Sequence, residues 1–276
     1  MKLAIIADLH IDRNARRLKP GDTYSELLSQ VVQEARADAL LIAGDVMNDY
    51  LGVDNFIKKV TDNLDIPVWF VPGNHDLWQM DEENKTSAFT ILDYFKKQPY
   101  NLVGNPQLLG DEYALVGNGG WYDYGYGDSN QYSEEDFEKK QYRFANWNDV
   151  NYINFEGVSD KEVSQMMLDE LIADLEKVKD KKIILMTHIA THKGFVVPLP
   201  NKLYDYVNAF LGATSYEHLY KDYNVVYNIM AHVHLRHTLH EEGTTHIMAS
   251  LGNSRQWINK ENPYMEIKNT LYTLDI

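Results

Sequence analysis

The sequence contains no cysteine, and this absence excludes several classes of site at once. Without thiols there is no disulfide framework, no thiolate zinc site, no iron–sulfur cluster and no cysteine nucleophile. Any metal ion in this protein must therefore be bound by nitrogen and oxygen atoms.

Positive charge and long apolar runs are also scarce. Lys and Arg total 26 against 41 Asp and Glu, which gives a net charge of −15 and an average field that repels phosphate backbones. This balance argues against a dedicated nucleic-acid binder. No stretch approaches the roughly 18 consecutive apolar residues that span a bilayer, and residues 1–7 are too short for the apolar region of a signal peptide. We expect a cytoplasmic protein without membrane association.

Short β-rich apolar runs alternate with helical patterns along the 276 residues. Two capping boxes, Thr23-x-x-Glu26 and Ser159-x-x-Glu162, predict helix starts. This alternation favours a layered α/β protein, and no repeat or low-complexity linker interrupts it, so we expect residues 1–276 to form one domain. The expected strands are residues 3–7, 39–43, 68–71, 113–116, 183–186, 225–230, 245–248 and 270–274.

Residues 118–155 depart from the alternation because glycines are mixed there with many aromatic residues, Trp121 and Trp147 among them. Such a mixture is typical of loops held by aromatic packing. We expect an insertion over one edge of the sheet. Its aromatic side chains either pack the insertion onto the core or form a substrate wall or lid that stacks on a base or sugar.

Metal-competent side chains follow five of the expected strands. In α/β proteins, sites gather beyond the carboxyl ends of the strands, so segments far apart in sequence can converge on one site. Each motif taken alone is equally typical of a turn or a cap; the ordered set favours one shared site. The segments are Asp8-Leu9-His10, Gly44-Asp45, Gly73-Asn74-His75-Asp76, Thr187-His188 and Ala231-His232-Val233-His234.

The donor types indicate which ions this site would hold. Imidazoles, carboxylates and one amide oxygen suit Mn, Fe, Co or Zn better than calcium. Seven ligands exceed the needs of one tetrahedral ion and predict two ions about 3.5–4 Å apart that share a carboxylate. The seven are Asp8, His10, Asp45, Asn74, His188, His232 and His234.

As an ordered set, spanning residues 8 to 234, these motifs resemble the calcineurin-like metallophosphoesterases. The resemblance implies a four-layer α/β/β/α sandwich around a dinuclear centre. It implies that Asp8, His10 and His234 bind one metal, that Asn74, His188 and His232 bind the other, and that Asp45 bridges both. It also places His75 over the leaving group.

Two positions depart from the family pattern. Ala231 stands where the family usually has Gly; the extra methyl group should leave the ligands in place although it crowds the turn. Asn48 stands where phosphoprotein phosphatases have an Asp that orients the catalytic His, which weakens a protein phosphatase assignment.

The expected activity is hydrolysis of a phosphate ester by a metal-bridging hydroxide, with Mn, Fe or Zn as the two ions. His75 would protonate the leaving oxygen or, alternatively, only position a phosphate oxygen as a cation. The acidic composition disfavours long polyanions and leaves small phosphodiesters, phosphomonoesters, nucleotides or pyrophosphate-linked metabolites. Among these, the aromatic insertion favours a nucleotide-like phosphodiester. Arg13 and Arg143 are candidate phosphate clamps or surface ion-pair partners. The alternatives are a DNA exonuclease-type phosphodiesterase, a non-catalytic interaction scaffold on the same fold, and a metal-free structural protein with fortuitous motifs.

Overall fold

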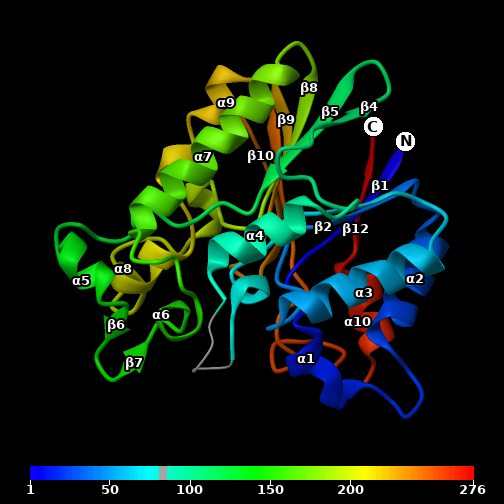
Figure 1. Cartoon of the computed structure of the whole chain (residues 1–276), viewed down its shortest axis with the longest axis horizontal. Coiled ribbons are helices and arrows are strands. Elements are labelled where there is room, and N and C mark those ends of the chain that lie inside the picture. Colours follow the sequence, from blue (N-terminus) through cyan, green and yellow to red (C-terminus); the bar gives the residue numbers. More distant parts are fainter. Residues whose placement is uncertain (81–85) are drawn as a thin grey trace.

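The computed structural model describes residues 1–80 and 86–276. Two β-sheets lie at its centre (Figure 1). The first sheet has the order β12-β1-β2-β3, in which β1, β2 and β3 run parallel and β12 is antiparallel to β1. Its strands are β1 (Lys2–Ile6), β2 (Ala39–Ile42), β3 (Val68–Phe70) and β12 (Tyr272–Asp275).

The second sheet has the order β10-β11-β9-β8-β5-β4, with a parallel centre and an antiparallel strand at each edge. Its strands are β4 (Gln107–Leu109), β5 (Tyr113–Asn118), β8 (Lys182–Thr187), β9 (Val225–Met230), β10 (Arg236–Glu241) and β11 (Thr244–Ala249). All eight expected strands are confirmed, while β4, β10 and the short hairpin of β6 (Gln141–Tyr142) and β7 (Ala145–Asn146) were not predicted.

The two sheets pack face to face through alternate residues of their central strands. Leu3 and Ile5 of β1 share one buried cluster with Ile184 and Met186 of β8. The intervening residues of β1 point to the opposite face, where helices cover them. Because both faces of these strands are covered, their sequences are apolar throughout.

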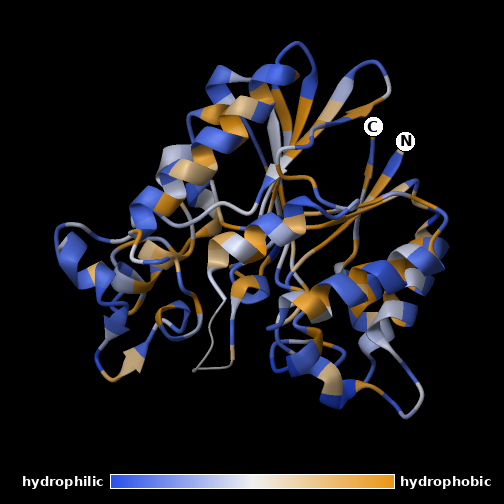
Figure 2. Ribbon diagram, viewed as in Figure 1, coloured by the Kyte–Doolittle hydropathy of each residue, from blue (hydrophilic) through white to orange (hydrophobic). Residues whose placement is uncertain are grey.

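Helices form the two outer layers (Figure 1). On the first sheet lie α2 (Tyr24–Ala35), α3 (Tyr50–Asn63) and α10 (Pro263–Thr270); on the second lie α7 (Asp160–Lys177) and α9 (Leu219–Asp222). Figure 2 shows apolar residues concentrated on the strands and polar residues on the outward sides of these helices. The four-layer α/β/β/α sandwich is therefore confirmed.

Both predicted capping boxes begin helices. The Thr23 hydroxyl accepts from the Glu26 amide at the start of α2, and Ser159 and Glu162 exchange both bonds of the box at the start of α7. The other helices in the described part of the chain are α1 (Ile11–Asn14), α4 (Ala88–Lys96), α5 (Glu134–Glu138), α6 (Asp149–Tyr152) and α8 (Tyr204–Val207). The 3₁₀ turns described are Ala15–Arg17, His75–Leu77, Lys193–Phe195, Asn208–Phe210 and Thr214–Tyr216.

Residues 118–155 leave the second sheet after β5 and contain α5, the β6–β7 hairpin and α6, at the lower left of Figure 1. No helix in the described part of the chain is long and apolar enough to cross a membrane.

Candidate metal centre

The structure brings all eight residues of the predicted site together at the carboxyl ends of five strands. One half of the site comes from the residues after β1 and from His234, which follows β9. The other half comes from the residues after β3 and β8 and from His232, which also follows β9, and Asp45, after β2, lies between the two halves. Convergence of these segments follows from the parallel arrangement of their strands.

The first group consists of Asp8, His10, Asp45 and His234, whose ligand atoms lie within 4.8 Å of one another. His10 Nε2 is 3.0 Å from His234 Nε2 and 3.7 Å from Asp45 Oδ2. Asp8 Oδ1 is 3.7 Å from His234 Nε2. Asp8, His10 and Asp45 are fully buried, so three of the four potential ligands are shielded from water, and His234 is partly exposed.

The second group consists of Asp45, His188 and His232. His188 Nε2 is 3.4 Å from Asp45 Oδ1, 3.1 Å from His232 Nδ1 and 3.2 Å from Asn74 Oδ1. Asp45 therefore directs Oδ2 toward the first group and Oδ1 toward the second, as a bridging carboxylate would.

The hydrogen bonds on the outer sides of two histidines show that this donor set fits a cation. His188 Nδ1 lies 2.9 Å from the Ala43 carbonyl oxygen, and His232 Nε2 lies 3.0 Å from that of Phe210. A carbonyl only accepts, so both outer nitrogens carry the proton, and the inner nitrogens face each other as lone pairs. Lone pairs 3.1 Å apart repel unless a cation lies between them.

Three histidines of the centre, His10, His188 and His232, are held in the neutral form that ligation requires. Burial lowers the pKa of His10 and of His188, and it lowers the pKa of His232 to about 4. Burial also raises the pKa of Asp45, and the nearby Asp8 adds to that rise. The lowered pKa values of the histidines and the raised pKa of Asp45 mean that neutral imidazoles surround carboxylates without a positive counter-charge. Divalent ions would supply that charge.

The backbone of the site is strained where the ligands are presented. Five of the eleven non-glycine residues with positive φ in the described chain belong to the predicted ligand set, and each costs roughly 1–2 kcal/mol. Such residues persist only where surrounding contacts hold them. They are Asp8 (φ 51°), His10 (41°), Asp45 (57°), His232 (70°) and His234 (57°).

Asp76 fastens the loops after β2 and β3 to each other, a role that the sequence analysis did not assign. Its carboxylate accepts from the backbone amides of Asp45, Val46 and Gly73 at 2.8 Å each, and from that of Met47 at 3.3 Å. The loops also need glycine, because a Cβ on Gly73 would overlap Asp45 Oδ1. The sequence offered one sign of this role: Asp76 follows the candidate catalytic residue His75 directly, and it is an acid to which no role as a metal ligand was assigned.

Asp149, in α6, orients the amide of Asn74 and was also missed. Its Oδ1 accepts from Asn74 Nδ2 at 2.8 Å and from Trp78 Nε1 at 2.7 Å, and its Oδ2 accepts from Trp147 Nε1 at 2.8 Å and from the Tyr122 hydroxyl at 3.3 Å. With Nδ2 engaged, Asn74 Oδ1 must face His188. No local pattern marks Asp149, because its partners come from three separate segments.

His75 lies beside the first group, with its Nε2 3.9 Å from Asp45 Oδ2. Asn48 Oδ1 accepts from His75 Nδ1 at 2.6 Å, so the asparagine that replaces the family Asp still orients this imidazole, without adding charge. The Trp78 ring packs on the other side of His75, with ring centroids 3.8 Å apart. Burial lowers the pKa of His75, and the neighbouring His10 and Arg13 lower it further.

The remaining sequence expectations divide between the centre and the core. Ala231 is fully buried and leaves His232 and His234 in place. Trp121 is a core residue whose Nε1 donates to Asp160, whereas half-buried Trp147 contacts the ring of His232 at 5.9 Å between centroids. Arg143 stacks on its neighbour Tyr142 in the β6–β7 hairpin, away from the ligands.

Comparison with known proteins identifies the family and the fold. The family model of calcineurin-like phosphoesterases matches residues 1–236. Similar solved structures include a phosphopantetheinyl hydrolase from Mycobacterium tuberculosis (18% identity, TM-score 0.77, covering 99% of this chain and 95% of that one). They also include TT1561 of Thermus thermophilus (14%, 0.52, 99% and 98%) and a dimetal phosphatase from Danio rerio (16%, 0.50, 96% and 90%).

At these identities, the structural likeness establishes the fold, and the family match carries the assignment. No curated protein matches the sequence. The chain belongs to the calcineurin-like phosphoesterases and is thus a metal-dependent phosphoric ester hydrolase with a dinuclear divalent metal centre.

Proposed function

We propose that this protein hydrolyses a small, nucleotide-like phosphodiester at the centre between the two sheets. The observation that carries the proposal is the position of Asp45, whose two oxygens face two separate groups of nitrogen and oxygen ligands at 3.4–3.7 Å. Asp8, His10 and His234 would hold one ion, and Asn74, His188 and His232 would hold the other, with Asp45 shared.

Ions bound by these residues supply Lewis-acid chemistry: they lower the pKa of water and draw charge from phosphoryl oxygens. The chain supplies orientation and the exclusion of solvent. Carbonyl oxygens fix the tautomers of His188 and His232, and Asp149 fixes the amide of Asn74. Because Asp8, His10 and Asp45 are fully buried, their charge and lone pairs act in a region of low dielectric constant.

His75 is proposed as the proton donor to the leaving oxygen. His75 donates its Nδ1 proton to Asn48. A second proton, on Nε2, would make the imidazole a cation, and this Nε2–H would be its only free N–H and would face the metal centre. The lowered pKa of His75 means that this cation releases the Nε2 proton readily. In the alternative, positioning role, the same N–H binds a phosphate oxygen and keeps its proton.

Residues 118–155 are proposed as one wall of the substrate site within a single domain of 276 residues. Trp147 supports this, because it reaches the ring of His232 and stacks on Phe210 at 5.3 Å between centroids. We propose that Trp147, rather than the core residue Trp121, contacts a base or other flat group of the substrate.

The test is hydrolysis of bis-p-nitrophenyl phosphate and of p-nitrophenyl phosphate by chelator-stripped protein reloaded with Mn²⁺, Fe²⁺ or Zn²⁺. We expect metal-dependent turnover of the diester that is abolished by His188→Ala. Replacement of the exposed histidine His218 by alanine is the matched control and should retain activity. Absence of metal-dependent turnover with all three ions would contradict the proposal, and tight, salt-sensitive DNA binding would favour an exonuclease instead.

A second candidate substrate class comes from the fold similarity to the phosphopantetheinyl hydrolase, which extends over 99% of this chain. In that case the diester would join a phosphopantetheinyl group to an alcohol. Release of phosphopantetheine from a phosphopantetheinylated carrier protein, absent with His188→Ala, would support it. Turnover of nucleotide diesters alone would contradict it.

A further inference from the structure

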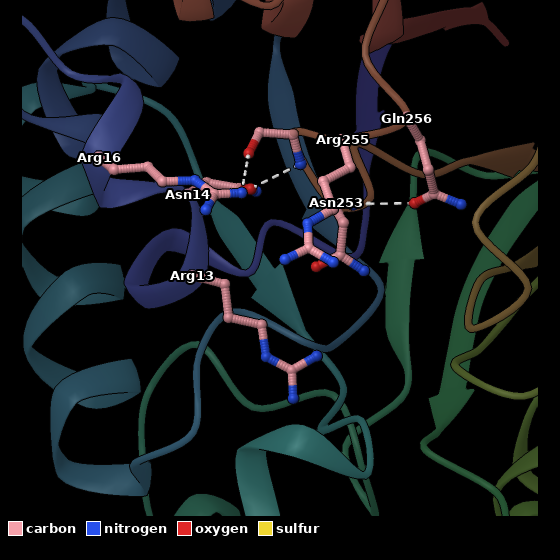
Figure 3. Close-up of a pocket in the computed structure, with 7 residues that line it drawn as sticks. Arg13, Asn14, Arg16, Asn253, Arg255 and Gln256 are labelled. Atoms are coloured by element: carbon pink, nitrogen blue, oxygen red, sulfur yellow. Dashed lines mark hydrogen bonds between the residues drawn. The ribbon is translucent and has the colours of Figure 1, made fainter.

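Among the described residues, three arginines and no carboxylate line a cavity of about 560 Å³ beside the metal centre. Figure 3 shows Arg13 and Arg16, from the segment that follows His10, on one side and Arg255, from the loop after β11, on the other. The described residues that line the cavity are Arg13, Asn14, Arg16, Asn253, Ser254, Arg255 and Gln256.

These three arginines have no carboxylate partner among the described residues, although the chain carries 15 more acidic than basic side chains. Arg17 and Arg236 are paired, with Glu261 and Glu266, each at 2.6 Å, whereas Arg36 and Arg143 lie outside the cavity and also lack a carboxylate partner among the described residues. Three guanidinium groups around one cavity repel one another unless an anion neutralises them. Their arrangement thus indicates a binding site for an anion rather than a set of surface ion pairs.

The cavity is held by a buried asparagine that joins its two sides. Asn14 is 1% exposed, and its Nδ2 donates to the carbonyls of Leu9 and Gly252 at 2.9 and 3.0 Å. Its Oδ1 accepts from the Ser254 amide at 2.8 Å. The arginines therefore extend from a backbone frame built of segments 240 residues apart, which Asn14 holds together.

The frame adjoins the metal centre at two points. Gln256 Oε1 lies 3.3 Å from His234 Nδ1, and the backbone N–H of Asn14 donates to the backbone carbonyl of His10 at 2.9 Å. The Arg13 guanidinium lies 5.1 Å from the centre of the Trp78 ring, which itself packs on His75. A group bound by the arginines therefore lies directly beside a phosphoester held at the centre.

We propose that this cavity binds a second phosphate group of the substrate, so that the natural substrate carries a charged phosphate besides the ester that is cleaved. Guanidinium groups match phosphate oxygens in bidentate pairs, and the volume exceeds that of one phosphate, leaving room for part of a sugar or a similar linker. This inference rests on the proposed function, whose scissile ester lies at the centre.

The test measures binding to metal-free protein, in which no substrate is turned over. Chelator-stripped protein is titrated calorimetrically with adenosine 3′,5′-bisphosphate, and with adenosine as the uncharged reference. Saturable binding of the bisphosphate only is expected, weakened by added salt. In Arg13→Gln/Arg255→Gln the affinity should fall at least tenfold, because charge-assisted bonds are lost, and Arg255→Gln alone should give an intermediate loss.

Arg36→Gln is the matched control, because Arg36 follows α2 and lies next to the amino ends of the strands, whereas the cavity lies beyond their carboxyl ends. It should bind the bisphosphate like the unmodified protein. Lack of saturable binding, or equal affinity in the double variant, would overturn the inference. Arginine-dependent binding of a poly-glutamate peptide without binding of the bisphosphate would overturn it in favour of an acidic polypeptide. None of these results depends on hydrolysis, so they are separable from failure of the proposed function.

Discussion

Replacing Asp149 by asparagine should damage the metal centre without touching any ligand. The carboxylate accepts four hydrogen bonds, all from uncharged donors, and is 2% exposed. The asparagine side chain has one oxygen and one NH₂ group in place of the two carboxylate oxygens. One pair of donors would therefore face the NH₂ group, and that pair is either Asn74 and Trp78 or Trp147 and Tyr122. Hydrogen bonds to a charged group contribute about 1.5–3 kcal/mol each.

Loss of two such bonds predicts a decrease of about 3–6 kcal/mol in the free energy of unfolding for Asp149→Asn, which is a large part of the roughly 5–15 kcal/mol of a typical domain. The variant should also bind metal 10–100-fold more weakly, because in either orientation the two donors that face the NH₂ group repel it and displace the side chain that holds Asn74 Oδ1 toward His188. Urea unfolding of the chelator-stripped protein measures the first quantity, and titration with Mn²⁺ measures the second.

Asp54→Asn is the matched control for this prediction. Asp54, on α3, is likewise buried and accepts from the hydroxyls of Tyr94 and Tyr100 and from Lys58, but it contacts no predicted ligand. Its replacement should destabilise the fold and leave metal affinity within a few-fold of the original. Equal metal affinity in Asp149→Asn and Asp54→Asn would refute the orienting role of Asp149.

Three further predictions concern the loops, His75 and pH. Gly73→Ala should weaken metal binding by more than tenfold in the same titration, because its Cβ overlaps Asp45; unchanged affinity would show that the loop can shift freely. Asn48→Asp should raise the pKa of His75 by placing a charge at its Nδ1, so the alkaline limb of kcat should move to higher pH, and an unmoved limb would favour the positioning role. Burial, and then a nearby histidine, lower the pKa of His246 to about 4. As pH falls below about 6.5, His246 becomes protonated in the unfolded chain but not in the folded one, so the free energy of unfolding decreases between about pH 6.5 and pH 4. His246→Gln should remove about 2 kcal/mol of the stability difference between pH 7.5 and pH 5 in urea unfolding of the metal-free protein; an identical difference in both proteins would contradict this.

The sequence predicted the central strands and the ligands for related physical reasons. A strand covered on both faces must be apolar throughout, so β1, β2 and β8 are visible as short runs without periodicity. A polar residue that ends such a run is conspicuous, and Asp8, Asp45 and His188 were found in this way.

The unpredicted parts lack such local signals. Strand β10 contains four charged or histidine residues in six and lies at the edge of its sheet, where side chains stay exposed and no apolar run is required. The partners of Asp149 and the cavity of the three arginines depend on contacts between segments far apart in the chain. Nothing in the order of residues around Arg255 indicates that Asn14 holds its loop against Arg13.

The strain of the centre explains why these unpredicted residues matter as much as the ligands. Five predicted ligands in the left-handed region together cost on the order of 5–10 kcal/mol, which is comparable to the net stability of a whole domain. The opposing contributions come from hydrogen bonds that hold the loops, above all the four backbone amides on Asp76 and the four donors on Asp149. A ligand motif without these two buried carboxylates could relax to ordinary backbone angles, and its side chains would then no longer converge. The geometry of the centre is therefore a property of both sheets and of residues 118–155 together, and the ligand residues alone do not determine it.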